Sequence, residues 1–354
     1  MNAQIPPLDL QAEFREIRSE LLKHTRSVLA GGRYILGKEV EQFEHAFTRF
    51  VGSRYAVGVA NGSDALLLAL IALGVKAGDE VITTSFTFIS TATAIVRLGA
   101  KPVFVDIEPG TFNLNPDLIE TKLTKRTRGI IAVHLYGNPC RIDRIKSLAK
   151  RFGLFVIEDC AQASGAQFQG RRVGTFGEFG AFSFYPTKTL GAFGDAGMVT
   201  TNSKKLFEQI KSIHRHGEDG RDHAYRHTSI GINSRLDELQ AAVLNVKLKH
   251  LARWNEARRK AAERYNQLML NDGQIILPTE TPGAKAVYHQ YVIRTSRRDA
   301  LLCHLRSHGI QAAVYYPVPL HLQPCFRSLG YKRGDFAEAE RASREVLSLP
   351  LYPQ

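Results

Sequence analysis

One lysine stands in a context that could make it a nucleophile. Lys188 ends the segment Ser183–Lys188, which follows a β-rich run and contains a proline, and small residues follow it at Gly191 and Gly194. A lysine held against backbone among small residues is poorly solvated, so its pKa falls and its neutral amine can form a Schiff base with an aldehyde. The same spacing also fits an ordinary surface lysine on a turn.

A carboxylate could contact an aldehyde cofactor that also carries a nitrogen-containing ring. Asp159 ends the β-rich run 154–159, where its side chain could face a ligand or simply meet solvent. Pyridoxal phosphate needs a carboxylate against its ring nitrogen, because that contact keeps the nitrogen protonated and the ring an effective acceptor of electrons. Asp159 is therefore a candidate partner of that ring nitrogen.

A third segment could bind a phosphate group. Gly62 and Ser63 open an apolar helical pattern, and a helix start offers free N–H groups, a hydroxyl and the positive end of the helix dipole. A plain N-cap would look the same. Together with Asp159 and Lys188, however, this segment completes a phosphate cradle, a ring-nitrogen partner and a Schiff-base lysine in chain order. The combination predicts pyridoxal 5'-phosphate as the cofactor.

Alternating strands and helices must position these groups. Apolar positions recur at helical spacing in 65–73 and 141–151, between short β-rich runs. Such alternation indicates an α/β fold with a mostly parallel central sheet covered on both faces, and ligands of such sheets gather beyond the carboxyl ends of the strands. The β-rich runs are 80–84, 102–106, 129–134, 154–159, 180–184 and 197–201.

The pattern changes in the last third of the chain. Residues 236–268 form one long helical stretch, with Leu239, Val243, Val246 and Leu251 on one stripe. A smaller mixed α/β segment follows to the end. We therefore predict two domains: an N-terminal arm and large cofactor-binding domain over 1–245, and a small C-terminal domain over 246–354.

Composition narrows the classes of partner. The 354 residues include 47 Lys and Arg against 34 Asp and Glu, a formal charge of +13 that favours an anionic partner such as nucleic acid, a membrane surface or a phosphorylated small molecule. The four cysteines stand far apart without a paired spacing, so we expect a reducing cytoplasm, no disulfide scaffold and no metal. The uncharged run 65–75 is shorter than the ~20 apolar residues of a membrane-spanning helix.

The chain resembles the sugar aminotransferases of the DegT/DnrJ/EryC family, from about Ile5 to Gln354. The likeness implies the aspartate-aminotransferase-like fold, that is, fold type I of the pyridoxal-phosphate-dependent transferases. It also implies a further helix beyond Gln354, which this sequence does not contain. The motifs that carry the resemblance occupy residues 32–37, 60–66, 85–89, 158–162, 183–188, 231–235 and 316–321.

The resemblance implies roles around the cofactor ring. Lys188 would hold the cofactor through its Schiff base and move a proton between the substrate carbon and the C4′ atom. Asp159 would pair with the pyridine nitrogen, Gln162 would lie near the phenolic oxygen, and Phe88 would stack on the ring.

It implies further roles around the phosphate and the substrate. Asn233 would reach the phosphate from the neighbouring subunit, which makes a homodimer with shared active sites the smallest complete unit. The residues expected to hold the phosphate within one chain are Gly62, Ser63 and Ser183. The residues expected to lie toward the sugar nucleotide are Arg235, Tyr316 and His321.

The implied reaction is transfer of an amino group from L-glutamate to a keto group of a nucleotide-linked hexose. C3 is favoured over C4 because residues 32–235 most resemble the C3 enzymes. Tyr315 stands where relatives that act on keto-uronic acids tend to carry histidine, which disfavours a uronate. Lys188 stands where the family's dehydratases carry histidine, which favours amino transfer.

Two alternatives stay open. The first is a different sugar reaction on the same fold with the same cofactor. The second is a regulator that binds nucleic acid, which the charge of +13 would allow. The basic residues are scattered, however, and no helix-turn-helix or finger is evident, so we expect no nucleic acid and no membrane among the partners.

Overall fold

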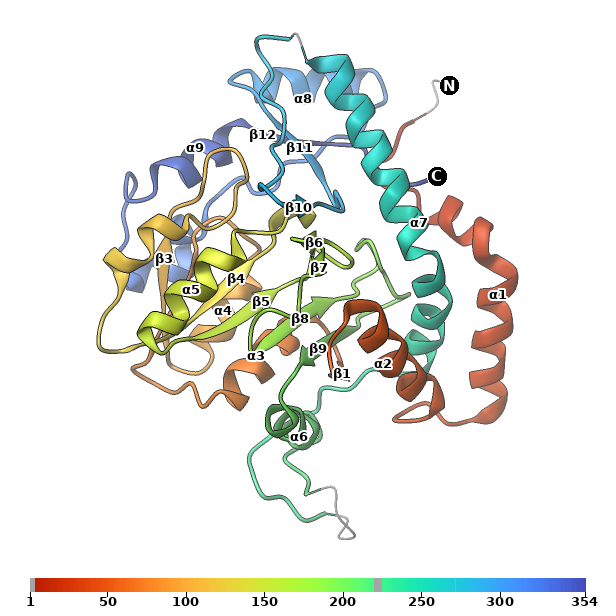
Figure 1. The fold of residues 1–354 in the computed structure, drawn as a ribbon. Helices are drawn as coiled ribbons and strands as arrows, with labels where there is room; N and C mark the ends of the chain where they lie inside the picture. The colour runs from red at the N-terminus through yellow and green to blue at the C-terminus, as the bar shows by residue number, and fades with distance from the viewer. Residues whose placement is uncertain (1–3, 220–224, 271) are drawn as a thin grey trace.

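A seven-stranded sheet forms the centre of the computed structural model, which describes residues 4–219, 225–270 and 272–354 (Figure 1). Its strand order is β1-β9-β8-β5-β4-β2-β3, and β9 runs antiparallel to both strands that flank it, β1 and β8, whereas the pairs from β8 to β3 are parallel. The mostly parallel sheet that we predicted is confirmed. The strands are β1 (Tyr55–Val59), β2 (Glu80–Thr84), β3 (Lys101–Val105), β4 (Thr127–Val133), β5 (Phe155–Asp159), β8 (Phe179–Ser183) and β9 (Gly197–Thr201).

Two features of the sheet differ from the sequence-based expectation. Strand β1 was not anticipated, and β9 pairs antiparallel with both β1 and β8. Parallel neighbours need a long crossover, usually a helix, whereas the link between β8 and β9, residues 184–196, contains none. The chain therefore returns antiparallel, and the returning loop carries Lys188.

Helices cover both faces of the sheet, because successive strand residues point to opposite sides. On β4 and β5, Ile130 and Val156 pack toward α5, whereas Ile131 and Ile157 pack toward α3. The face of α3 also carries α4 and α6, and the opposite face carries α2 and α7. These helices are α2 (Lys38–Val51), α3 (Gly62–Ala72), α4 (Ser90–Val96), α5 (Ile142–Phe152), α6 (Lys204–Ile213) and α7 (Glu238–Met269).

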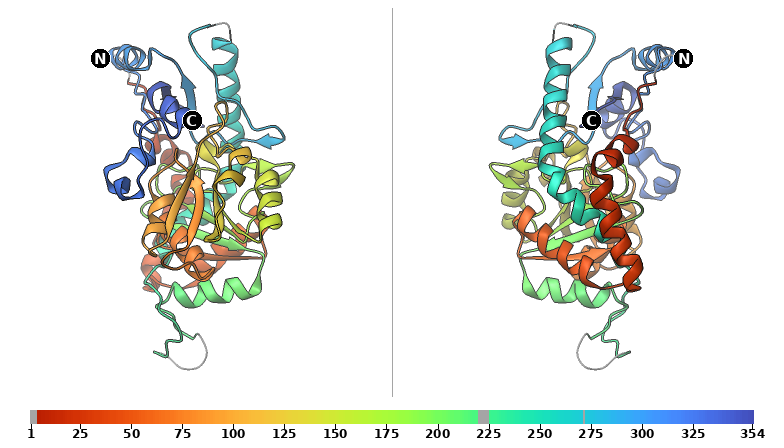
Figure 2. Two further views of the ribbon diagram at one scale, coloured as in Figure 1. Left: turned by 90° about the vertical axis from the view of Figure 1, so that its left-hand side faces the viewer. Right: turned by 90° about the vertical axis from the view of Figure 1, so that its right-hand side faces the viewer.

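Helix α7 joins the sheet to the C-terminal part of the chain. Helix α1 (Leu10–Gly31) lies beside it along one flank (Figure 2). The domain boundary that we predict at residue 245 falls inside α7. The later elements are β10 (Ala284–Lys285), β11 (Tyr291–Arg294), α8 (Arg298–Ser307), α9 (Ala337–Glu345) and β12 (Val346–Leu349), and β11 pairs with β12.

Short elements complete the connections. Strand β10 pairs with β6, and β6 pairs with β7, so residues on both sides of the predicted boundary share one small sheet. The two remaining strands are β6 (Gln167–Phe168) and β7 (Arg171–Arg172). The short 3-10 helices are η1 (Pro116–Leu118), η2 (Glu120–Lys122), η3 (Leu135–Gly137), η4 (Leu320–Leu322) and η5 (Pro324–Leu329). In the part of the chain that the structure describes, no helix is both long and apolar enough to cross a membrane.

A distant glutamate caps the start of α2. Gly37 at the N-cap has no side chain to accept the free N–H groups. The Glu238 carboxylate accepts them instead, from Gly37 at 2.7 Å, Glu39 at 2.9 Å and Val40 at 3.0 Å. A carboxylate is also favourable at the positive end of a helix. Glu238 thereby fixes the glycine-rich segment before α2 to the start of α7.

Candidate active site

A cavity of about 810 Å3 lies beyond the carboxyl ends of β2, β4, β5 and β8. This is the edge of the sheet at which we predicted a ligand. Of the residues predicted to contact the cofactor, all except Asn233 line the cavity, and Tyr316 lines it too. The predicted residues in its wall are Gly62, Ser63, Phe88, Asp159, Gln162, Ser183, Lys188 and Tyr316.

The start of α3 has the geometry of a phosphate cradle. A Cβ atom on Gly62 would lie 2.6 Å from the Cβ of Ser183, so only glycine lets the helix start approach this strand end. The Ser63 hydroxyl lies 2.6 Å from that of Ser90, and both serines line the cavity. Free N–H groups, a helix dipole and hydroxyls at one point suit a phosphate. We did not anticipate Ser90 from the sequence.

Two hydrogen bonds fix the Asp159 carboxylate. The Thr91 hydroxyl donates to Oδ2 at 2.8 Å, and the Ala161 N–H donates to Oδ1 at 3.2 Å. Burial raises the pKa of Asp159, and the bonds from Thr91 and Ala161 oppose that rise. Asp159 is thus an oriented acceptor in the cavity wall, as the ring nitrogen of pyridoxal phosphate requires.

Lys188 is half-buried in the cavity wall, and its backbone N–H donates to the Tyr185 carbonyl at 2.8 Å. Gly191 is required nearby, since a Cβ atom there would lie 2.3 Å from the Pro186 carbonyl oxygen. Burial lowers the pKa of the Lys188 amine to about 8, and the negative charge of Asp159 opposes this shift. A substantial fraction of this amine is therefore neutral near pH 8, the form that attacks an aldehyde.

Gln162, just after β5, and Tyr316, from the C-terminal segment, meet in the cavity wall. Gln162 Nε2 donates to the Tyr316 hydroxyl oxygen at 3.1 Å, and its Oε1 accepts the Tyr136 N–H at 2.6 Å. Phe88, 54% exposed, lies 6.3 Å from the Tyr316 ring between centroids. An aromatic face that is open to the cavity suits stacking against a ligand ring.

Three predicted residues lie outside this cavity. Asn233 and Arg235 lie in residues 225–237, the arm that leads into α7, where Arg215 bridges to Asn233. Arg235 lines a separate surface hollow, and Asn233 is exposed. His321, expected toward the substrate, is buried instead, and its Nε2 lies 3.0 Å from the Glu340 carboxylate. The physical reason is that hydrogen bond to Glu340, together with an aromatic contact to Phe336.

A buried trio adjoins the cavity, which His134 lines, with the possible ligand atoms of His134, Glu158 and Cys160 within 4.8 Å of one another. The polar groups of His134 and Glu158 are already paired. The Glu158 carboxylate accepts a hydrogen bond from His134 Nε2 at 3.1 Å and one from each of three backbone N–H groups. The Cys140 N–H donates to His134 Nδ1 at 3.1 Å. His134 and Glu158 therefore stabilise the end of β5 through a hydrogen-bonded network.

Sequence reasoning missed Thr91 and His289, which also line the cavity. Thr91 lies two residues beyond the motif 85–89, in a threonine-rich stretch that could have drawn attention to it. His289 carries no comparable signal. Burial and the positive charges of Lys188 and Arg258 hold the pKa of His289 well below its usual range, so this imidazole is neutral.

Comparison with known sequences agrees with this geometry. A sequence model described as the DegT/DnrJ/EryC1/StrS aminotransferase family matches residues 15–354. A "pleiotropic regulatory protein" of Geobacillus stearothermophilus is 47% identical over 352 residues, covering 99% of this chain and 94% of that protein. A dTDP-3-amino-3,4,6-trideoxy-alpha-D-glucose transaminase of Streptomyces venezuelae is 43% identical over 350 residues, covering 99% of this chain and 92% of that protein.

Comparison with solved structures gives the same grouping. DesV of S. venezuelae, crystallised in complex with a ketimine intermediate, superimposes with a TM-score of 0.96 at 43% identity over 99% of this chain and 94% of that one. NtdA of Bacillus subtilis, crystallised with the cofactor PMP, superimposes with a TM-score of 0.88 at 32% identity over 96% of this chain and 78% of that one.

Proposed function

Because the chain belongs to the DegT/DnrJ/EryC1/StrS aminotransferase family and is a sugar aminotransferase of fold type I, we propose that it uses pyridoxal phosphate to move the amino group of L-glutamate to the C3 keto group of a nucleotide-linked hexose. The observation that carries this proposal is a single cavity lined by Lys188, Asp159 and the N-terminus of α3.

Each residue of the cavity has a separate role in the proposed reaction. When bound, pyridoxal phosphate supplies an aldehyde carbon that accepts an amino group and a ring that withdraws electrons. The start of α3 would bind the phosphate, Asp159 would keep the ring nitrogen protonated, and Phe88 would cover one face of the ring. Lys188 Nζ would take a proton from the substrate carbon and return it at C4′. Its pKa of about 8 suits an amine that must accept and release a proton near neutral pH.

The proposed acceptor follows from charge and from the relatives. A net charge of +13 favours an acceptor that carries a diphosphate. The S. venezuelae relative is named for a dTDP-linked sugar with its amino group at C3, which supports C3 over C4. Of the residues predicted to face the sugar nucleotide, Tyr316 lines the cavity of its own chain.

We further propose that two copies of the chain share their active sites. Asn233 and Arg235 lie on an arm outside the cavity of their own chain, and Ile230 on the same arm is 93% exposed. A second copy that covers this arm would bring Asn233 to the phosphate and Arg235 to the sugar nucleotide. The four free cysteines suit a reducing compartment, from which we infer a cytoplasmic enzyme.

The test is an absorbance spectrum of the protein loaded with pyridoxal phosphate, before and after addition of L-glutamate. The proposal expects a visible band that fades with L-glutamate and returns with a UDP- or dTDP-linked 3-keto hexose. Lys188→Ala should abolish turnover.

Each other outcome has a definite meaning. A band that ignores L-glutamate would overturn the donor, and recovery only with 4-keto sugars would overturn C3. If no band forms, the cofactor proposal is wrong; a salt-dependent shift of generic DNA would then favour the regulatory alternative.

A further inference from the structure

One tyrosine joins the large sheet to the C-terminal segment at the edge of the cavity. Tyr136 lies in η3, directly after β4, with a left-handed φ of 58°. Its N–H donates to Gln162 Oε1 at 2.6 Å, and its carbonyl accepts the Gln290 N–H at 3.4 Å. Its hydroxyl donates to the Tyr315 carbonyl. All three polar groups of this residue thus bind segments that border the cavity.

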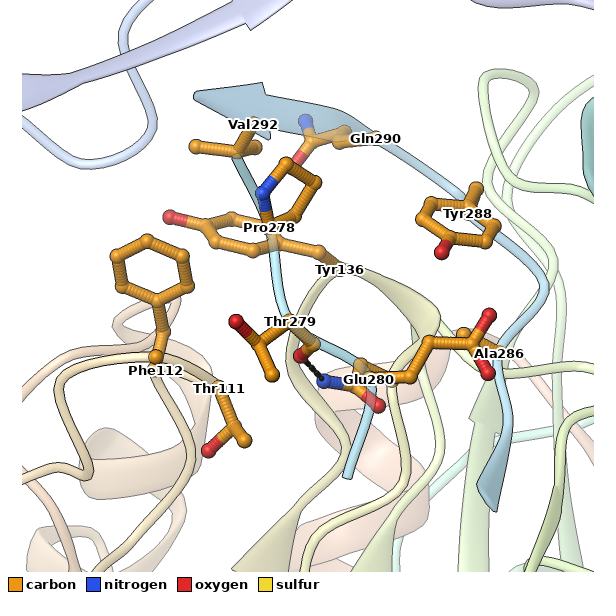
Figure 3. Close-up of a pocket in the computed structure, with 12 residues that line it drawn as sticks. Thr111, Phe112, Tyr136, Pro278, Thr279, Glu280, Ala286, Tyr288, Gln290 and Val292 are labelled. Atoms are coloured by element: carbon orange, nitrogen blue, oxygen red, sulfur yellow. Dashed lines mark hydrogen bonds between the residues drawn. The ribbon is translucent and has the colours of Figure 1, made fainter. Parts of the chain in front are cut away.

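The Tyr136 side chain lies behind the cavity wall. The residue is 6% exposed, and its ring meets that of Phe112 edge-on at 5.6 Å between centroids. It borders a second, smaller cavity of about 20 Å3, room for roughly one water molecule, beside Pro278 and Val292 (Figure 3). In that view the hydroxyl points away from Tyr288. Because Tyr136 does not line the active-site cavity, its hydroxyl acts on other residues of the chain.

Tyr136 controls the orientation of the Gln162 carboxamide. An N–H group can bind only the amide oxygen, so the Tyr136 N–H leaves Gln162 Nε2 free to donate to the Tyr316 hydroxyl oxygen. The Tyr136 hydroxyl meanwhile holds the carbonyl of Tyr315, the residue before Tyr316. Tyr136 therefore fixes both partners of the contact between Gln162 and Tyr316.

We propose that Tyr136 is a positioning residue that holds the sugar-facing wall of the cavity, Tyr315 and Tyr316, against Gln162. That the wall faces a sugar rests on the proposed function. The effect of Tyr136 on the position of Tyr315 and Tyr316 is a property of the protein, and it can be measured without a sugar substrate.

The test removes one hydroxyl group and compares it with a matched change elsewhere. Tyr136→Phe deletes the bond to the Tyr315 carbonyl and leaves the backbone bond to Gln162. Tyr265→Phe in α7 is the control, because Tyr265 also donates to a backbone carbonyl, that of Pro350, at 3.0 Å and does not line the cavity. Both variants are compared with the wild type as cofactor-loaded proteins.

The first readout is hydrogen exchange of the segment 315–322, whose Leu320 amide is bonded to the Ser85 carbonyl at 2.7 Å. One lost hydrogen bond should accelerate exchange there about two- to tenfold in Tyr136→Phe and leave it unchanged in Tyr265→Phe. Equal exchange in Tyr136→Phe and the wild type, or equal acceleration in both variants, would overturn the proposal.

The second readout separates the two substrates of the enzyme. With UDP- and dTDP-linked 3-keto hexoses as acceptors, Tyr136→Phe should raise the acceptor KM about two- to tenfold and leave the L-glutamate KM unchanged. An equal change in both KM values would indicate a merely structural role and would overturn the proposal. If the wild type uses none of these acceptors, the proposed function fails, and hydrogen exchange alone decides the role of Tyr136.

Discussion

The Thr91 hydroxyl donates a hydrogen bond to the Asp159 carboxylate, with Oγ1 and Oδ2 2.8 Å apart, and both side chains are buried. Thr91 lies in the first turn of α4 and Asp159 at the end of β5. Burial alone favours the neutral acid, whereas this bond favours the carboxylate that the proposed ring nitrogen needs.

Thr91→Val should therefore weaken the donor half-reaction, most strongly in acid. Valine keeps the shape of the side chain but removes the donor, so the pKa of Asp159 rises further and the carboxylate is protonated at a higher pH. A hydrogen bond to a charged group contributes about 1.5–3 kcal/mol, so on the acid side of the pH profile we expect a rate about tenfold or more lower. The measurement is the pH dependence of the fading of the visible band with L-glutamate.

Thr91→Ser is the matched control, since serine retains the hydroxyl. In Thr91→Ser, the pH at which the rate falls off in acid should stay close to the wild-type value. In Thr91→Val, that pH should be higher. If the profiles of valine and serine variants coincide, the hydrogen bond has no influence on Asp159.

Loading of the cofactor-free protein should follow the protonation of Lys188. With a pKa of about 8, the neutral amine is scarce below pH 8 and dominant above it. The rate of appearance of the visible band should rise about tenfold per pH unit up to about pH 8 and then level off. Lys188→Arg, which keeps a charge but cannot form the bond, should give no band. A midpoint near the ordinary lysine value, about 10.4, would contradict this account.

Gly62→Ala should damage the phosphate cradle. The new Cβ would lie 2.6 Å from the Cβ of Ser183, and such overpacking costs about 1–3 kcal/mol of folding free energy. Ser183 must also shift, so the affinity for pyridoxal phosphate should fall. Thermal unfolding and a cofactor titration measure the two effects.

Another helical glycine provides the comparison. Gly31, at the end of α1, has open space where a Cβ atom would lie, with no neighbouring atom within 4 Å, so Gly31→Ala should leave both quantities unchanged or raise the stability slightly. Equal behaviour of the two variants would show that the close approach at Gly62 does not matter.

Local signals were enough to predict much of the fold. The runs 80–84 and 197–201 coincide with β2 and β9, and the predicted helix 236–268 nearly coincides with α7. Strand β1 was missed because Gly58 interrupts its apolar pattern. The direction of β9 depends on the link that precedes it, which a β-rich run does not encode.

Local patterns suggested several candidate residues of the site. Asp159 ends β5, Ser63 lies in the first turn of α3, and Lys188 follows β8 by five residues in the loop to β9. Thr91 acquires its role only through Asp159, which is far away in sequence, and His321 is buried through its partner Glu340. Contacts of that kind depend on the packed structure, and no spacing in the sequence predicts them.

The proposal that two chains share their active sites makes a prediction about mixed chains. Lys188→Ala removes the amine from its own cavity, whereas Asn233→Ala with Arg235→Ala removes the arm residues that we propose reach the partner's cavity. Each variant alone should have little activity. A dimer of one chain of each kind has one cavity with Lys188 of one chain and an intact arm from the other. Random exchange makes half of the dimers mixed, so activity should recover to about a quarter of the wild-type value.

A second mixture tests whether recovery requires two chains at one cavity. Lys188→Ala and Asp159→Asn both alter the cavity of their own chain, so every cavity in a dimer of these two variants is damaged. That mixture should stay inactive at the same total protein concentration. Mass spectrometry of the intact dimers confirms in each case that chains have exchanged. Recovery in both mixtures, or in neither despite exchange, would show that Asn233 and Arg235 do not complete the partner's site.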